Sequence, residues 1–233
     1  MRNLNASPQF RVGLIVPSSN TVMEPHFHRY LSHRATVSTT RILLEDVTRE
    51  AEEKMLSEEL PQALRRIQTV APDVLVFGCT SAGSLGGIDH DRTIGQCIGE
   101  ATGVPALTVI GSVIAQLKEL GARRVAVFTP YQPELTSRVA ACVSEAGFEV
   151  VKAAGMGLVS NREVGAVTPE EILSYVAREF SGVAADCIFL SCTNWRAFDA
   201  TDCLRRELKV NVVSSNQACI DEILRLEAQR CFQ

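Results

Sequence analysis

Several features that define common protein classes are missing from this sequence. No apolar run approaches the roughly 18 residues of a membrane-spanning helix. The N-terminal MRNLNASPQF lacks the long apolar core of a secretory signal. The chain has no P-loop motif, and the glycines of GSLGGID do not follow the spacing of a dinucleotide-binding turn. We therefore expect a cytoplasmic protein without a membrane segment and without a nucleotide site.

Charge and metal-ligand patterns are also sparse. The formal net charge is −4, so nothing favours nucleic acid or an anionic lipid surface as a partner. The eight cysteines include no CxxC pair, and the four histidines have no metal-type spacing with them. The sequence therefore predicts no metal site. In a chain that is not exported, so many cysteines indicate free thiols rather than a disulfide framework.

What the chain does contain is an internal repeat. VLVFGCTSAG carries Cys79 at the end of an apolar run, and CIFLSCTNWR carries Cys192 at the end of another, 113 residues later. The same offset separates three further pairs: Asp73 and Asp186, Arg11 and Arg124, and Arg49 and Arg162. We infer a duplicated unit in which the two cysteines occupy equivalent places.

Strand-like apolar runs alternate with amphipathic helical runs along the whole chain. The expected strands are 12–16, 36–41, 74–77, 106–109, 125–128, 149–152, 187–190 and 210–213. Several are continuously apolar, as expected for parallel strands that are covered on both faces. The alternation predicts βαβ units, and together with the repeat it predicts an α/β fold of two similar doubly wound lobes.

The lobes are expected to comprise residues 1–118 with 214–233, and residues 119–213. The last helix, within NQACIDEILRLEAQR, has no counterpart left in the second lobe and is expected to cross back to the first. TPEEILSYVAREF predicts a helix with a capping box formed by Thr168 and Glu171. In EEKMLSEELPQALRRI, Pro61 is expected to start a second helix or to kink the first.

Ligands of doubly wound sheets bind at the carboxyl ends of the strands, where both cysteines fall. The sulfurs are followed by donor-rich residues that can bind a carboxylate: Thr80, Ser81, Thr193 and Asn194. Two symmetric thiols suit attack and proton transfer on opposite faces of a flat substrate. The alternative for a single free cysteine is a small buried hydrophobe, which fits Cys97, Cys142 and Cys187.

Further polar residues are expected to face the same cleft. In VPSSNT, Ser18 and Asn20 can bind a carboxylate, although Asn20 fits a helix N-cap equally well. Tyr131 in TPYQP either donates its hydroxyl to a ligand or shields the cleft, and Asn161 lies in a polar loop or a solvated turn. No histidine follows His90, which disfavours a cysteine–histidine dyad.

On these residues, the chain resembles the aspartate/glutamate racemase superfamily, and within it the maleate isomerase and arylmalonate decarboxylase branch. The motifs that carry the resemblance span nearly the whole chain: VGLIVPSSNTVMEP, FGCTSAG, FTPYQPEL, LSCTNW and VVSSNQA. The resemblance implies two Rossmann-like lobes related by a pseudo-twofold axis, with the active site in the cleft between them. It also implies that no cofactor is needed, that the substrate is a small carboxylate, and that the protein is a homodimer or homotetramer.

The resemblance further implies that Cys79 and Cys192 are catalytic, and that Asn20, Tyr131 and Asn161 hold substrate carboxylates. For a maleate isomerase, the Cys79 thiolate would add to the double bond while Cys192 protonates the adjacent carbon. Rotation and elimination would then release fumarate. Neighbouring donors would stabilise the enolate-like charge.

Three other functions stay open. The polar loop CTSAGSLGG resembles the wider superfamily, so a two-thiol racemase of aspartate, glutamate or a related 2-substituted acid is the main alternative. No acidic residue adjoins either cysteine motif, which favours a substrate without an amine. An arylmalonate-type decarboxylase is less favoured, because those enzymes work with a single cysteine. A non-enzymatic small-acid binding protein would share the two-lobed shape but would not need paired thiols.

Overall fold

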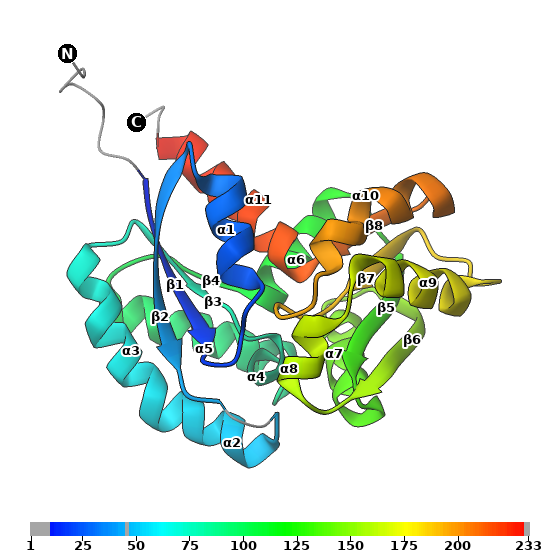
Figure 1. The fold of residues 1–233 in the computed structure, drawn as a ribbon. Coiled ribbons are helices and arrows are strands. Elements are labelled where there is room, and N and C mark those ends of the chain that lie inside the picture. The colour runs from blue at the N-terminus through cyan, green and yellow to red at the C-terminus, as the bar shows by residue number, and fades with distance from the viewer. Residues whose placement is uncertain (1–9, 45–46, 231–233) are drawn as a thin grey trace.

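A computed structural model describes residues 10–44 and 47–230. Within these residues lie two four-stranded parallel sheets, one in each of the two lobes seen in Figure 1. The first sheet has the order β2-β1-β3-β4, from β1 (Phe10–Pro17), β2 (Ala35–Ile42), β3 (Val74–Phe77) and β4 (Ala106–Thr108). The second has the order β6-β5-β7-β8, from β5 (Arg124–Tyr131), β6 (Glu149–Leu158), β7 (Cys187–Leu190) and β8 (Asn211–Ser214).

Helices connect these strands and cover the sheets (Figure 1). In the first half of the chain they are α1 (Met23–Leu31), α2 (Arg49–Lys54), the π-helix η1 (Met55–Glu59), α3 (Leu60–Ile67), the 3₁₀ turn η2 (Gln68–Val70), α4 (Thr80–Gly83), α5 (Gly87–Thr102) and α6 (Val109–Glu119). In the second half they are α7 (Pro133–Glu145), α8 (Asn161–Ala166), α9 (Pro169–Phe180), α10 (Ala197–Leu208) and α11 (Ser215–Arg230).

The predicted duplication is visible in the register of the sheets. Val12 of β1 lies opposite Val74 of β3, and Val125 of β5 lies opposite Cys187 of β7. Both pairs obey the offset of 113 residues found in the sequence. The two sheets also have the same strand order, since β5 to β8 take the places of β1 to β4. The α/β fold with two similar lobes is confirmed.

The paired aspartates have a structural task at the start of the strands. The Asp73 carboxylate accepts the main-chain N–H of Arg11 at 2.8 Å, and the Asp186 carboxylate accepts that of Arg124 at 3.1 Å. Each aspartate also donates its own main-chain N–H to the carbonyl of the same arginine. These bonds satisfy main-chain groups where the central strand pair of each sheet begins.

The helical segment with Pro61 is continuous but changes its geometry. It runs through α2 and η1, and Pro61 lies in the first turn of α3. Proline cannot donate the main-chain hydrogen bond of an α-helix, and its ring needs room near the preceding turn. The wider π-turn of η1 directly before it supplies that room.

The chain ends by returning to the first lobe, as expected. Figure 1 shows α11 beside α1 and α6. Ile220 and Ile223 of α11 share a buried cluster with Met23 and Phe27 of α1. The lobe boundaries at residues 118/119 and 213/214 stay a prediction.

The central strands of each sheet are buried on both faces. Alternate residues of a strand point to opposite faces, so Ile15 and Phe77 belong to one cluster of the first lobe while Leu14 and Val76 belong to the other. This arrangement explains the uninterrupted apolar runs in the sequence. Among the described helices, none is both long and apolar enough to cross a membrane.

Two local expectations can be compared with the structure. The capping box of α9 is confirmed: Thr168 Oγ1 accepts the N–H of Glu171 at 3.2 Å, and the Glu171 carboxylate accepts the N–H of Thr168 at 2.8 Å. The strand expected at 149–152 is longer, because β6 continues to Leu158. Its outer half is rich in alanine and glycine, so it lacked the apolar pattern used to place strands.

Candidate active site

Both cysteines lie just beyond the carboxyl end of a central strand. Cys79 follows β3 and precedes α4, and Cys192 follows β7. Their side chains are buried, with exposed fractions of 3% and 5%. The two motifs touch directly, because the Thr193 hydroxyl donates to the Gly78 carbonyl at 3.0 Å. Residues that are more than a hundred positions apart therefore meet between the lobes.

Asn20 satisfies main-chain groups at the start of a helix, and binding of a carboxylate by its amide stays a prediction. Its Oδ1 accepts the main-chain N–H groups of Val22 and Met23 at 3.0 and 2.9 Å, which caps the start of α1. Its Nδ2 donates to the Thr193 hydroxyl at 3.0 Å, across the lobe boundary. Because an amide nitrogen has two hydrogens, this geometry holds the amide rigidly beside the cysteine motifs with donor capacity to spare.

Asn194 and Asn161 extend this polar network. Asn194 Oδ1 accepts the N–H of Thr21 at 2.8 Å, and its Nδ2 donates to the Asn161 carbonyl at 2.6 Å. Asn161 is the first residue of α8 rather than a loop residue, and its Nδ2 donates to Ser19 Oγ at 2.6 Å. Ser18 lies apart from this network, since its hydroxyl accepts the N–H of Leu44 at 3.2 Å.

Cys192 is surrounded by hydrogen-bond donors. Burial raises the pKa of Cys192 to about 11, but three donors hold it below the value that burial alone would give. They are the Tyr131 hydroxyl and the main-chain N–H groups of Asn194 and Trp195. The Asn194 nitrogen lies 3.3 Å from the sulfur. Tyr131 thus contacts a catalytic candidate directly.

Cys79 has a different environment. Burial raises the pKa of Cys79 to about 12, and the negative charge of Glu52 raises it further. The Ser81 hydroxyl, whose oxygen lies 3.5 Å from the sulfur, and the N–H of Ala82 act in the opposite direction. A charge on Cys192 also raises the pKa of Cys79, so the two thiols lie close enough to influence each other.

Glu52 is the site residue that the sequence did not reveal. It lies on α2 with an exposed fraction of 0%, and its carboxylate is 3.6 Å from the Arg138 guanidinium of α7. The expectation that no acid adjoins a cysteine motif holds along the chain but is wrong in space. Apart from Ala51, every residue of REAEEK in α2 is charged, so nothing distinguished Glu52 from its exposed charged neighbours. Only the fold turns it inward.

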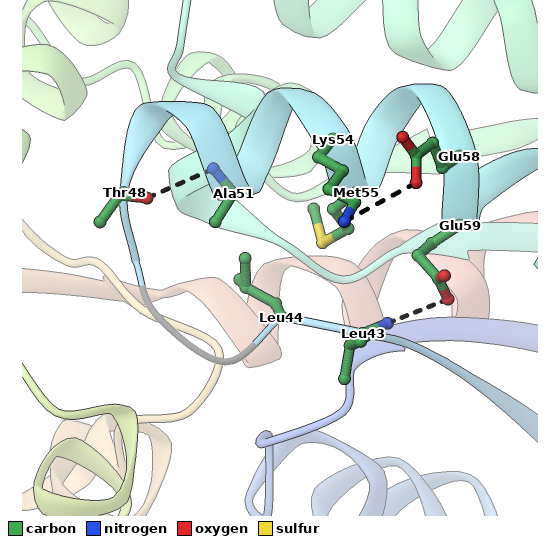
Figure 2. A pocket seen from close by; sticks show the side chains of 8 residues that line it. All are labelled: Leu43, Leu44, Thr48, Ala51, Lys54, Met55, Glu58 and Glu59. Atoms are coloured by element: carbon green, nitrogen blue, oxygen red, sulfur yellow. Dashed lines mark hydrogen bonds and ion pairs between the residues drawn. The ribbon is translucent and has the colours of Figure 1, made fainter.

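A separate surface pocket lies near the expected polar loops. Figure 2 shows it between α2, η1 and the segment after β2, with Thr48 at one end. Thr48 takes the 113-residue repeat position of Asn161, and its hydroxyl accepts the N–H of Ala51 at 3.3 Å, which caps α2. No cysteine lines this pocket of about 230 Å³. A smaller cavity of about 60 Å³ is lined by Tyr131 and Asn161 and so borders the cysteine site.

Metal ligands do not gather in the part of the chain that the structure describes. Within residues 10–44 and 47–230, no three histidine, cysteine, aspartate or glutamate side chains are placed to hold a metal ion.

Comparison with known protein families decides the relationship of the chain. The sequence pattern of the family described as arylmalonate decarboxylase matches residues 12–231. The chain belongs to the arylmalonate decarboxylase family.

This member of the arylmalonate decarboxylase family is also similar to curated and solved maleate isomerases. The maleate isomerase of Geobacillus stearothermophilus is 27% identical over 93% of this chain and 91% of its own. A Nocardia farcinica maleate cis-trans isomerase, solved as a mutant with a covalently bound succinylcysteine intermediate, is 25% identical. It covers 93% of this chain and 91% of its own, with a TM-score of 0.86. A Pseudomonas putida maleate isomerase covers 93% and 92% with a TM-score of 0.87 at 25% identity.

The exposure of the remaining cysteines depends on where each lies on its helix or strand. Cys142 and Cys187 are buried, and burial raises the pKa of each to about 12, as expected for small core hydrophobes. The same interpretation is wrong for Cys97, which is exposed. The buried stripe of α5 passes through Ile94 and Ile98, and Cys97 lies beside that stripe on the outer face.

Proposed function

We propose that the protein catalyses the cis–trans isomerisation of maleate to fumarate. The observation that carries this proposal is the pair of buried thiols, Cys79 and Cys192, brought together from equivalent strand ends with their motifs joined by the Thr193–Gly78 hydrogen bond. The likeness to maleate isomerases over more than 90% of the chain supports it.

In the proposed reaction, the Cys79 thiolate adds to one olefinic carbon of maleate. The carbon–sulfur bond forms while the π electrons move to the adjacent carbon as an enolate, which takes the proton of the Cys192 thiol. The product is a succinyl thioether whose central carbon–carbon bond is single and rotates. Cys192 then removes a proton, the carbon–sulfur bond breaks, and fumarate leaves. The succinylcysteine in the Nocardia farcinica relative supports such an adduct.

The surroundings of the thiols support this division of labour. A proton donor works well when its conjugate base is stabilised, and the thiolate of Cys192 would accept hydrogen bonds from Tyr131 and two main-chain N–H groups. With a pKa of about 11, Cys192 holds its proton at neutral pH and is ready to donate it. Cys79 has fewer donors, so its thiolate is less stable and more reactive.

The substrate carboxylates are proposed to bind to the polar groups around the sulfurs. Thr80 Oγ1 is buried and has no hydrogen-bond partner among the described residues. A buried hydroxyl without a partner is costly, so it is suited to a ligand that completes its hydrogen bonding. Asn20 Nδ2 uses one hydrogen for the Thr193 hydroxyl, next to Cys192 in sequence, and its second hydrogen is left for a ligand.

Proton NMR of the reduced protein with maleate in D₂O tests the proposal. The expected result is a fumarate signal that is absent with Cys79→Ser. No fumarate from folded, reduced protein would refute the proposal. The same assay with aspartate and glutamate detects a racemase as loss of the α-proton. This arm is needed because Glu52 removes the sequence argument against a substrate with an amine.

We also propose that the protein acts in the cytoplasm as a homo-oligomer, with a small carboxylate as its ligand and with neither nucleic acid nor membrane as a partner. The cysteines from Cys79 to Cys219 are free thiols, which suits a reducing compartment. Size-exclusion chromatography with light scattering tests the oligomer, and a monomeric mass at micromolar concentration would refute it.

A further inference from the structure

Glu52 is a buried carboxylate that the proposed reaction has not yet used. Its exposed fraction is 0%, and neither oxygen forms a hydrogen bond of normal geometry with any described residue. A buried charged group in this state is costly unless something compensates for it. The Arg138 guanidinium at 3.6 Å supplies a positive charge, but that distance is longer than a hydrogen bond. The carboxylate is therefore free to accept a proton.

Ser81 contacts the thiol of Cys79 and lies on α4, which packs against the helix α2 that carries Glu52. The Ser81 hydroxyl oxygen is 3.5 Å from the Cys79 sulfur, within reach of a sulfur hydrogen bond. The same hydroxyl acts on Glu52 and lowers the pKa of its carboxyl. Thiol, hydroxyl and carboxylate are thus all buried on neighbouring elements, the last two on helices that pack together.

The charges around this chain of groups favour a single negative charge. Burial raises the pKa of Glu52, while Arg138 of α7 and Arg49 of α2 lower it. A charged Glu52 raises the pKa of Cys79 and also that of Tyr131, and a charge on Cys192 acts on both as well. A thiolate and a carboxylate together would place two like charges in one buried region. A proton that moves from one to the other avoids this.

We propose that Glu52 accepts the proton of Cys79 through the Ser81 hydroxyl, so that the nucleophilic thiolate forms without releasing a proton to solvent. The Cys79 S–H bond breaks as its proton reaches Ser81 Oγ, and the proton of Ser81 passes to a Glu52 oxygen. The net charge of the three groups stays at −1. When the thiol leaves during elimination, the same steps run in reverse. This inference rests on the proposed function only in taking maleate as the molecule that the Cys79 thiolate attacks.

Arg138 and Glu52 come from different lobes, which gives the pair a second consequence. The guanidinium stabilises the carboxylate before transfer and loses this partner after it, because the negative charge then lies on the Cys79 sulfur. The ion pair between the lobes is therefore weakest when the thiolate is present. An ammonium group of a substrate would compete with Arg138 for the same carboxylate. Glu52 is therefore assigned to proton transfer rather than to amine recognition.

The first experiment does not use maleate. The alkylation rate of Cys79 by iodoacetamide is measured against pH by peptide mass spectrometry, in the wild type, Glu52→Gln and the control Glu53→Gln. Glu53 is an exposed neighbour on α2 that pairs with Arg49. In the wild type and control, the logarithm of the rate should level off over a range of pH above the pKa of Glu52. In Glu52→Gln it should rise by one for each pH unit. A unit slope throughout in the wild type would overturn the inference, even if Glu52→Gln fails to fold.

The second experiment measures turnover of maleate. Glu52→Gln should lower kcat at pH 7 about 10²-fold with little change in KM, and the loss should shrink about tenfold for each pH unit of increase as hydroxide replaces the carboxylate. Ser81→Ala should lower kcat while keeping the level region of the alkylation profile, and Glu52→Asp should restore part of the rate. A Glu52→Gln or Ser81→Ala enzyme with wild-type kcat would overturn the relay. If the wild type does not convert maleate, the proposed function fails while the alkylation result stands by itself.

Discussion

The two lobes share a backbone plan but place different side chains around their cysteines. At the 113-residue offset, Ser81 corresponds to Asn194 and Glu52 corresponds to Gly165. The correspondence holds in space. A Cβ on Gly165 would lie 3.2 Å from Asn194 Nδ2, and in the other lobe the equivalent residues Glu52 and Ser81 also interact. The second lobe thus has a glycine where the first has an acid.

A duplicated fold can therefore support an asymmetric reaction. Cys192 is surrounded by donors, which stabilise a thiolate, whereas Cys79 faces a carboxylate, which opposes a thiolate. Symmetric main chains bring the sulfurs to equivalent places, and a few substitutions around them give each a separate chemical character. Substitutions in either lobe test how far this difference reaches.

The largest effect is expected from removing either thiol. Cys79→Ser and Cys192→Ser should each lower turnover of maleate by about 10³-fold or more, because both act on the reacting carbons. The two variants should differ in what they trap. Cys192→Ser should accumulate a covalent adduct of one maleic acid, and Cys79→Ser should form none, as measured by intact-protein mass spectrometry. An adduct on the Cys79→Ser protein would reverse the assigned roles.

A smaller effect is expected from Tyr131→Phe. It removes a hydroxyl that donates to Cys192, so the pKa of Cys192 should rise above about 11 and less thiolate should be present at any given pH. The lost hydrogen bond to a charged sulfur corresponds to about 10- to 100-fold slower alkylation of Cys192. The alkylation rate of Cys79 in the same protein serves as the internal control. An unchanged Cys192 rate would show that the hydroxyl does not stabilise the thiolate.

Gly165→Ala tests the glycine that replaces Glu52 in the second lobe. The added Cβ would lie 3.0 Å from Thr21 Oγ1 and 3.2 Å from Asn194 Nδ2, so the polar network between the lobes must shift. The free energy of unfolding should fall by about 1–2 kcal/mol, measured by urea denaturation. Gly99→Ala is the control, because its Cβ would meet only the Val104 carbonyl at 3.7 Å. That change should stabilise the helix by about 0.5–1 kcal/mol.

The smallest effect concerns the paired aspartates. Asp73→Asn and Asp186→Asn each weaken a charge-assisted bond to the main chain at the start of a sheet, and each should lower the free energy of unfolding by about 1 kcal/mol. Similar losses in urea denaturation would support their equivalence. A loss at only one position would show that the two equivalent aspartates do not contribute equally to the free energy of unfolding.

Much of this fold could be predicted because it depends on patterns that are local or periodic. Apolar runs place the ends of the central strands within three residues, and a constant offset of 113 residues reveals the duplication before any contact is known. Cys79 and Cys192 follow from the same reasoning, since position at a strand end is readable from the chain. Asn20 also lies where it was expected, although its two hydrogen-bonding tasks could be separated only by geometry.

The residues that were missed depend on tertiary packing. Glu52 lies in a helix of mostly charged residues, and its burial is decided by how α2 packs against α4 and by Arg138 from the other lobe. Cys97 was misplaced for the opposite reason, because a cysteine within a helix has no intrinsic preference for the inner face strong enough to read. The outer half of β6 is built from small residues that carry no strand signal.

The return of α11 to the first lobe has a consequence for synthesis of the protein on the ribosome. The apolar side of α1, with Met23 and Phe27, is covered by Ile220 and Ile223, which come almost two hundred positions later in the chain. At about 5–20 residues per second, roughly 10–40 s separate the emergence of the two partners. Throughout that interval the nascent first lobe exposes part of its core, so its folding is completed only after α11 has emerged.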